Sequence, residues 1–214
     1  MKLYTYFRSS AAYRVRIALN LKGLPCESVP IHLVKDGGQH RKPEYLALNP
    51  AGLVPALDDD GRLLTQSLAI IEYLDETHPE PPLLPADAPG RARARALAQA
   101  IACDIHPLNN LRVLQYLKHE LGVDDAHKDA WYRHWVEVGL AAVEATLVHD
   151  ARTGRFCHGD TPGLADCCLV PQVFNARRFG AKLDGMPTIL RIAAACDELE
   201  AFRQAAPGRQ PDAE

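Results

Sequence analysis

The residues best suited to chemistry in this sequence stand where a strand-like pattern gives way to a helix-like one. Residues 3–7 are rich in strand formers, residues 13–22 place apolar side chains at helical spacing, and the turn between them reads Arg8-Ser9-Ser10-Ala11. A thioredoxin-type redox turn would carry two cysteines here, so disulfide exchange at this turn is excluded. A hydroxyl at a helix N-terminus, where unpaired N–H groups favour negative charge, suits a bound thiolate. A Ser-Ser pair taken alone is more typical of a simple helix cap.

Two later positions favour a ligand over a simple cap. Val54-Pro55 opens a strand-like run, and we expect a cis bond there that turns the Val54 backbone outward to pair with an extended peptide. Gln66-Ser67 stands at the start of another helix-like run, which is a second N-terminus able to hold a carboxylate. Together these positions imply a small peptide with a thiol at one end and a carboxylate at the other. Glutathione fits this description.

The elements that must position these residues predict a small mixed sheet with helical cover, in the order βαβ and then ββα. We expect strands over 3–7, 28–33, 54–57 and 63–65, helices over 13–22 and 67–76, and a long polar loop containing Gly37-Gly38.

A proline-rich segment divides the chain. Five prolines fall within residues 77–90, and proline removes backbone donors and fixes φ, so this segment predicts a domain seam. We expect an α+β fold with a mixed domain over 1–80, a linker over 81–90 and an all-helical domain over 91–214. The helices expected in the second domain cover 91–121 with a break at Pro107, 130–148, 164–179 and 188–204, before an extended tail over 206–212.

The composition sets limits on the function. The 214 residues are 47% hydrophobic and 24% charged, which is typical of a globular protein. A net charge of −3 gives no general attraction to nucleic acid, and no apolar run is long enough to span a membrane. The six cysteines show neither a CxxC pair nor zinc-ligand spacing, so we expect buried, reduced thiols, no metal and a cytoplasmic protein. Arg91, Arg93 and Arg95 are expected on a solvated helix face.

With these residues the chain resembles a known family, the zeta-class glutathione transferases. Within that family it is most similar to the bacterial glutathione-dependent maleylpyruvate and maleylacetoacetate isomerases. The likeness spans residue 3 to about residue 211. The motifs that carry it are residues 8–10 with 13–19, Asn49-Pro50, Val54-Pro55, 66–74, 105–111, Ala165-Asp166, 169–173 and 175–179.

The resemblance implies a thioredoxin-like N-terminal domain that binds glutathione as a cofactor. It implies that Ser9 faces the sulfur, with Ser10 and Ala11 lining the turn, and that Val54 pairs with the cysteinyl backbone. It also implies a homodimer. The residues it assigns to the rest of the glutathione site are Gln66 and Ser67 for the γ-glutamyl carboxylate, His40 toward the glycyl end, and His106 with Asn110 one helical turn apart.

Two positions depart from the family pattern. Ala11 stands where the family usually has cysteine, which suggests that this thiol is dispensable for isomerisation. Gly163 stands where the family usually begins a capping box with serine or threonine. Asp166 is therefore expected to keep only half of its reciprocal pair.

The activity that the resemblance implies is cis–trans isomerisation of a maleyl diketo acid, a dianion that needs carboxylate anchors. Arginine suits that role because its planar fork matches a carboxylate, and the candidates are Arg8, Arg112 and Arg178, of which Arg112 points away from Asn110 on an ideal helix. Ala11 and the extra basic residue Arg112 favour maleylpyruvate as the substrate. The alternatives are maleylacetoacetate, a zeta-like transferase or dehalogenase reaction, and a non-catalytic interaction protein.

Overall fold

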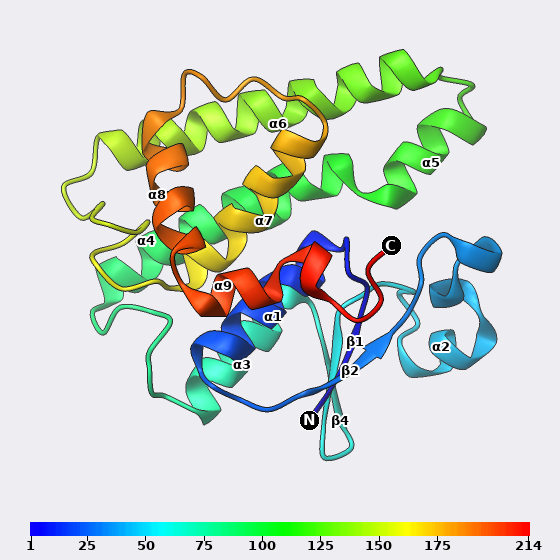
Figure 1. The fold of residues 1–214 in the computed structure, drawn as a ribbon, viewed down its shortest axis with the longest axis horizontal. Helices are drawn as coiled ribbons and strands as arrows, with labels where there is room; N and C mark the ends of the chain where they lie inside the picture. The colour runs from blue at the N-terminus through cyan, green and yellow to red at the C-terminus, as the bar shows by residue number, and fades with distance from the viewer. The chain divides into compact units, whose positions relative to one another are not determined.

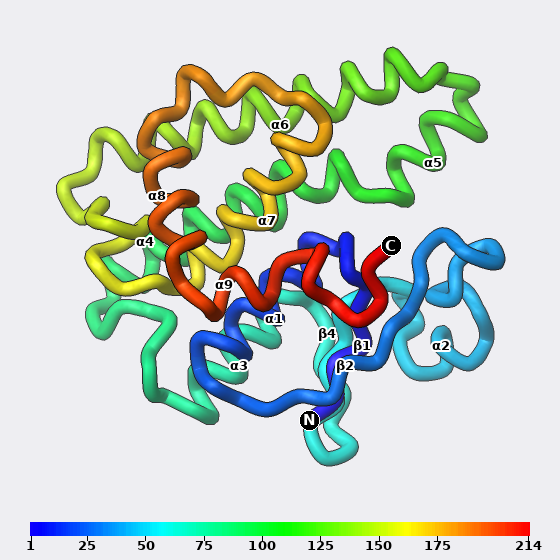
Figure 2. Tube along the Cα trace, viewed as in Figure 1, coloured from blue at the N-terminus to red at the C-terminus, as the bar shows by residue number.

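The computed structural model describes residues 1–214 and divides into two compact units (Figures 1 and 2). The first comprises Met1–Leu83 together with Asp197–Glu214, and the second comprises Leu84–Cys196. None of the helices is both long and apolar enough to cross a membrane.

The first unit is built on one four-stranded sheet with the strand order β2-β1-β3-β4. β1 pairs in parallel with β2, whereas β3 pairs antiparallel with both β1 and β4. Helices α1 and α3 lie on one side of the strands and α2 on the other (Figure 1), where the ring of Tyr45 contacts that of Tyr4. The strands are β1 (Lys2–Thr5), β2 (Glu27–Pro30), β3 (Ala56–Asp59) and β4 (Arg62–Thr65), and the helices are α1 (Ser10–Leu21), α2 (Pro43–Leu48), α3 (Ser67–Thr77) and α9 (Glu200–Ala205).

The strand directions collect the functional turns at one end of this sheet. β1, β2 and β4 all run toward that end, while antiparallel β3 begins there. Both α1 and α3 start at the same end, directly after β1 and β4. The predicted mixed sheet, its 54–65 hairpin and the two helix starts are therefore confirmed.

The second unit is helical, and its helices are α4 (Ala88–Gln99), α5 (Leu111–His119), α6 (Asp125–Val148), α7 (Leu164–Arg178) and α8 (Pro187–Asp197). The expected break at Pro107 is present. A π-helical segment, Ala100–Ile105, is followed by a 3-10 segment, His106–Asn109, before α5 begins. Proline has no N–H to give to the preceding turn, which explains why regular α-helical bonding stops here.

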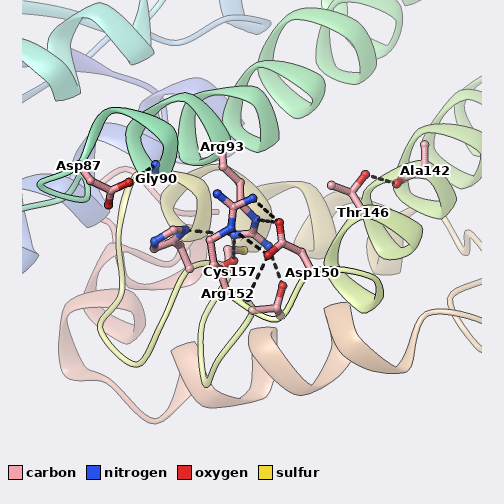
Figure 3. A network of polar contacts seen from close by, with 10 residues as sticks. Asp87, Gly90, Arg93, Ala142, Thr146, Asp150, Arg152 and Cys157 are labelled. Carbon is pink, nitrogen blue, oxygen red and sulfur yellow. Dashed lines mark hydrogen bonds and ion pairs between the residues drawn. The ribbon is translucent and has the colours of Figure 1, made fainter.

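A buried arginine ties α4 to the loop between α6 and α7 (Figure 3). Arg93 is 7% exposed, and its guanidinium donates to Asp150, to the Thr153 hydroxyl and to the Cys157 carbonyl at 2.6–2.7 Å. The expectation that Arg93 lies on a solvated face is wrong, because this loop supplies enough acceptors to bury the charge.

The start of α7 has the half capping box that the sequence predicts. Asp166 is buried and accepts the N–H of Gly163 at 2.9 Å, while glycine has no side chain to complete the pair. The other carboxylate oxygen of Asp166 accepts the Cys157 N–H at 2.9 Å. Burial raises the pKa of Asp166, and these two N–H groups oppose the rise.

Three expectations about the elements and one about the cysteines are wrong. The polar loop before β3 contains a helix, α2. Two helices, α8 and α9, replace the single helix expected over 188–204. The Arg203 guanidinium donates to the carbonyls of Asp197 and Glu198 and so ends α8. The tail contains a 3-10 turn, Pro207–Arg209. Of the six free cysteines, Cys103 is exposed and Cys26 is half-buried.

The division of the chain also differs from the expected boundary at 91–214. The segment from Asp197 onward packs within the first unit. Three side chains of α1 bond to carbonyls of this segment: Tyr13 to Phe202 at 3.5 Å, Arg16 to Ala205 at 3.0 Å and Asn20 to Ala201 at 2.9 Å.

Candidate active site

Ser9 is the N-cap of α1. Its hydroxyl oxygen accepts the N–H of Ala12 at 3.2 Å, and its main chain is extended, with φ −69° and ψ 115°. Ser9 is half-buried, whereas Ser10 behind it is 5% exposed. Because the Ser9 oxygen is used as an acceptor by the helix, its proton is free to be donated to an anion at the helix start.

Val54 and the start of α3 lie beside this turn in the sheet. The antiparallel registers pair Ala56, the first residue of β3, with Tyr4 of β1 and with Thr65 of β4. The Val54-Pro55 bond is cis, as the sequence predicts. Val54 lies two residues before Ala56, the first paired residue of β3, and packs with Tyr6 and Phe7 in a buried cluster.

Gln66 and Ser67 begin α3. Gln66 has a left-handed backbone, φ 68°, and is exposed, whereas Ser67 is buried. The Ser67 hydroxyl accepts a 3.2 Å hydrogen bond from Arg14, a 2%-exposed arginine of α1. A guanidinium buried directly behind a helix N-terminus adds positive charge where a carboxylate would bind.

A second buried arginine, Arg16, supports the turn that leads to Ser9. Its guanidinium donates to the carbonyls of Tyr6 (3.3 Å) and Phe7 (3.0 Å) and to the Thr5 hydroxyl (3.0 Å). Burial lowers the pKa of Arg16 to about 10, so it stays charged at neutral pH. Asp212 accepts the Phe7 N–H at 3.0 Å. The Arg16 guanidinium thus fixes the Tyr6 and Phe7 carbonyls, and the Asp212 carboxylate fixes the Phe7 N–H.

Arg8 and His40 complete the candidates in the first unit. Arg8 is exposed, and its guanidinium carbon lies 4.7 Å from the centre of the Phe7 ring. His40 is 9% exposed, and burial, followed by the nearby charge of Arg41, lowers its pKa. Its ring lies so close to Gly38 that a Cβ there would meet ring atoms at 2.5 and 2.8 Å. Ala11 is half-buried beside Ser9 and brings no thiol.

The candidates of the second unit fall into two groups. His106 and Asn110 contact each other, with 3.4 Å between ring Nε2 and amide Nδ2. Asn110 is also the N-cap of α5, where its oxygen accepts the Arg112 N–H at 3.1 Å. Asn110 lies outside the helix, with ψ 146°, so ideal helical geometry does not set the direction of Arg112 relative to it. Arg112 itself is exposed.

Arg178 lies in the last turn of α7 and is exposed, with its guanidinium carbon 5.2 Å from the centre of the Phe179 ring. That ring stacks on Tyr132 of α6 at 3.7 Å between centroids. The residue before Tyr132, Trp131, donates to the Leu108 carbonyl at 2.8 Å. Consecutive residues of α6 therefore hold both the end of α7 and the segment that carries His106 and Asn110.

Comparison with known proteins agrees with this geometry. The family model for the glutathione S-transferase N-terminal domain matches residues 3–82. A maleylacetoacetate isomerase of Pseudomonas aeruginosa is 55% identical over 99% of this chain and 98% of its own length. A solved bacterial maleylpyruvate isomerase, described as a zeta-class glutathione S-transferase, is 54% identical, covers all of both chains and superposes with a TM-score of 0.97.

The chain belongs to the glutathione S-transferase family. It is similar to the zeta class within that family, as the sequence analysis predicts. A solved maleylacetoacetate isomerase of Methylobacterium extorquens, 46% identical over all of both chains with a TM-score of 0.96, holds malonate and glutathione.

The donor groups of this transferase chain fit glutathione. The tripeptide has a thiol, an extended backbone and two carboxylates. The first unit offers the Ser9 hydroxyl at one helix start, the strand end at Val54, and a second helix start backed by the Arg14 guanidinium. These three features match in chemistry the thiol, the backbone and one of the two carboxylates.

Arg14 and Arg16 are the supporting residues that the sequence analysis missed as site residues. Both are buried in α1. The available signal was the presence of two arginines in a helix whose other side chains are mostly small or apolar, since such charges stay inside only when they are fully bonded.

Proposed function

We propose that this enzyme is a glutathione-dependent cis–trans isomerase that converts maleylpyruvate to fumarylpyruvate in the breakdown of aromatic compounds. The observation that carries the proposal is Ser9, a helix-capping hydroxyl that is half-buried and flanked by the exposed Arg8. A site with hydroxyl and guanidinium donors side by side suits a thiolate and a carboxylate together.

Bound glutathione supplies a thiolate that adds to the cis double bond and departs after the resulting single bond has rotated. In our proposal Ser9 donates its proton to the sulfur and so favours the thiolate. Arg16 and Asp212 keep the preceding backbone fixed, so the hydroxyl needs no reorganisation when charge develops. Val54, Gln66 and Ser67 hold the peptide part of the cofactor, with Ser10 and Ala11 lining the turn and His40 at the glycyl end.

The substrate is anchored through its carboxylates by Arg8, Arg112 and Arg178 in this proposal. All three guanidiniums are on exposed residues, and each has the planar fork that matches a carboxylate. The ring contacts of Arg8 and Arg178 restrain both side chains, which lowers the entropy lost when they grip a carboxylate. His106 and Asn110 contribute polar groups to the glutathione site in this proposal.

Maleylacetoacetate is the second candidate substrate. The identities to a maleylacetoacetate isomerase and to a maleylpyruvate isomerase, 55% and 54%, are nearly equal. The preference for maleylpyruvate depends on Ala11 and on the extra basic residue Arg112. Both diketo acids share the maleyl end, so the same chemistry serves either.

We further propose that the enzyme is a cytoplasmic homodimer. All six cysteines are free, and this agrees with a compartment in which glutathione keeps thiols reduced. The dimer follows from the family. Light scattering coupled to gel filtration tests it, and a mass near 23.5 kDa, that of one chain, would contradict it.

The test of the function is the absorbance change of freshly generated maleylpyruvate and maleylacetoacetate, each with and without glutathione. Conversion to the fumaryl isomer only with glutathione supports the proposal, and the substrate with the higher kcat/KM is the natural one. A protein that binds glutathione by calorimetry but converts neither acid is not this isomerase. It would then be assayed for conjugation or dehalogenation, and inactivity there would indicate an interaction protein.

A further inference from the structure

The loop between β2 and α2 is organised around a histidine that the sequence analysis did not select, His32. Its ring Nδ1 accepts two backbone N–H groups, from Val34 at 3.1 Å and from Lys35 at 2.8 Å. One side-chain nitrogen thus closes the first turn of the loop.

The main chain of His32 is bonded on both sides to Gln39. Its N–H donates to the Gln39 side-chain oxygen at 2.8 Å, and its carbonyl accepts the Gln39 N–H at 2.7 Å. His40 follows directly. Two hydrogen bonds therefore join the two ends of the loop at His32 and Gln39. Gln39 directly precedes His40, the histidine expected at the glycyl end of glutathione.

The ring of His32 also faces the cluster beside the Ser9 turn. It makes an edge contact with Tyr6, 4.9 Å between centroids, and Tyr6 belongs to the buried cluster that includes Val54. The neighbouring residues Ile31 and Leu33 pack against the same cluster. His32 is thus wedged between the loop and the strand ends that form the candidate site.

The hydrogen bonds define the protonation of the ring. Two donors at Nδ1 require a lone pair there, so the ring proton is on Nε2. Nε2 lies 3.4 Å from a carboxylate oxygen of Glu214, which also pairs with Lys35. The other charged groups near this face are Asp36, on the same loop, and Arg8, whose charge lowers the pKa of Glu214 after the larger effect of Lys35.

We propose that His32 is a positioning residue for glutathione binding. By accepting at Nδ1 it fixes the loop in the conformation that presents His40, so the cofactor does not have to order the loop when it binds. This inference rests on the proposed function. It predicts an effect on glutathione affinity and little effect on the chemical step.

Two substitutions at His32 separate the acceptor from the rest of the ring. His32→Phe keeps a ring against Tyr6 and removes the acceptor, whereas His32→Asn keeps an acceptor oxygen near the Nδ1 position and removes the ring. Glu214→Gln removes the charge that faces Nε2 and pairs with Lys35, while leaving the Nδ1 acceptor and the ring in place. His78→Phe is the matched control, because His78 ends α3 and makes its ring contact with Thr77.

We expect His32→Phe to raise the glutathione Kd and KM about 5–20-fold, the loss of two neutral hydrogen bonds. Its kcat at saturating glutathione should stay within about twofold of wild type. His32→Asn should restore most of the affinity, and Glu214→Gln and His78→Phe should bind as wild type. Hydrogen exchange of the free proteins should show faster exchange at Val34, Lys35 and Gln39 in His32→Phe alone.

The glutathione affinities and exchange rates of these variants test the positioning role of His32. Unchanged affinity and unchanged exchange in His32→Phe would overturn the positioning role, and so would His32→Asn binding as weakly as His32→Phe. A strongly lowered melting temperature in His32→Phe would show that His32 contributes to the stability of the fold. The glutathione affinity would then be compared in His32→Asn, as a folded protein. Wild-type protein that binds no glutathione would reject the proposed function, and this inference with it.

Discussion

Ser9 has two roles in our account, and replacing it by alanine tests them separately. The first role is structural, since the hydroxyl caps α1 through a 3.2 Å bond from the Ala12 N–H. Loss of such a cap costs about 1 kcal/mol, which lowers the melting temperature of a chain this long by about 2–4 °C. The second role is donation to the glutathione sulfur. A hydrogen bond to a charged group contributes about 1.5–3 kcal/mol, so its loss should lower kcat about 10–150-fold at neutral pH.

The same loss should raise the pKa of the bound thiol by about 1–2 units. The assay is the ultraviolet absorbance of the thiolate, titrated in the binary complex, alongside the isomerisation rate. Ser9→Thr keeps both the cap and the donor and should remain active. Asp87→Ala removes a cap of the same kind from α4, where Asp87 accepts the Gly90 N–H at 2.8 Å, and should leave the thiol pKa unchanged. A Ser9→Ala enzyme with wild-type rate and thiol pKa would refute the reasoning.

Three further predictions concern other side chains. Arg178→Ala should lower kcat/KM for the diketo acid about 10–100-fold while glutathione affinity stays within about twofold, with neighbouring Arg177→Ala as the control; equal loss of both would contradict the assigned role. Arg93→Met should lower the free energy of unfolding by about 2–4 kcal/mol, because it orphans buried acceptors, whereas Arg152→Met should change it little. Denaturant titration of tryptophan fluorescence measures both, and similar curves for the two variants would count against the Arg93 network. His40 has a lowered pKa in the fold, so protons bind the unfolded chain first and stability should fall as pH drops below about 6.5. His40→Gln should lack this part of the slope, and parallel slopes between pH 5 and 7 would exclude it.

The parts of the fold that the sequence predicted are those with a local signal. Short runs of strand-forming residues marked the strands, Gln66-Ser67 marked the start of α3, and Pro107 marked the interruption between α4 and α5. The roles of the candidate site residues stay predictions. What the structure adds is that the turns carrying them in the first unit share one end of the sheet, through the strand directions.

The features that escaped prediction depend on contacts between distant residues. No residue between Asp197 and Glu200 is a helix breaker; the break exists because Arg203 bonds to two carbonyls there. Arg93 has the sequence surroundings of a surface residue and is buried only because residues 150–157 return to it. His32 falls within the strand expected over 28–33, whereas β2 ends at Pro30, and its role depends on loop contacts that have no periodic pattern.

The return of the C-terminal segment to the first unit has a consequence for synthesis of the chain. Arg16 is made early, but one of its acceptors, the Ala205 carbonyl, is made almost 190 positions later. The first unit therefore cannot reach its final set of bonds while the ribosome is still translating the helices of the second. A nascent chain released before residue 201 would leave α1 without the carbonyls that α9 provides, and the turn that presents Ser9 would be completed only at the end of translation.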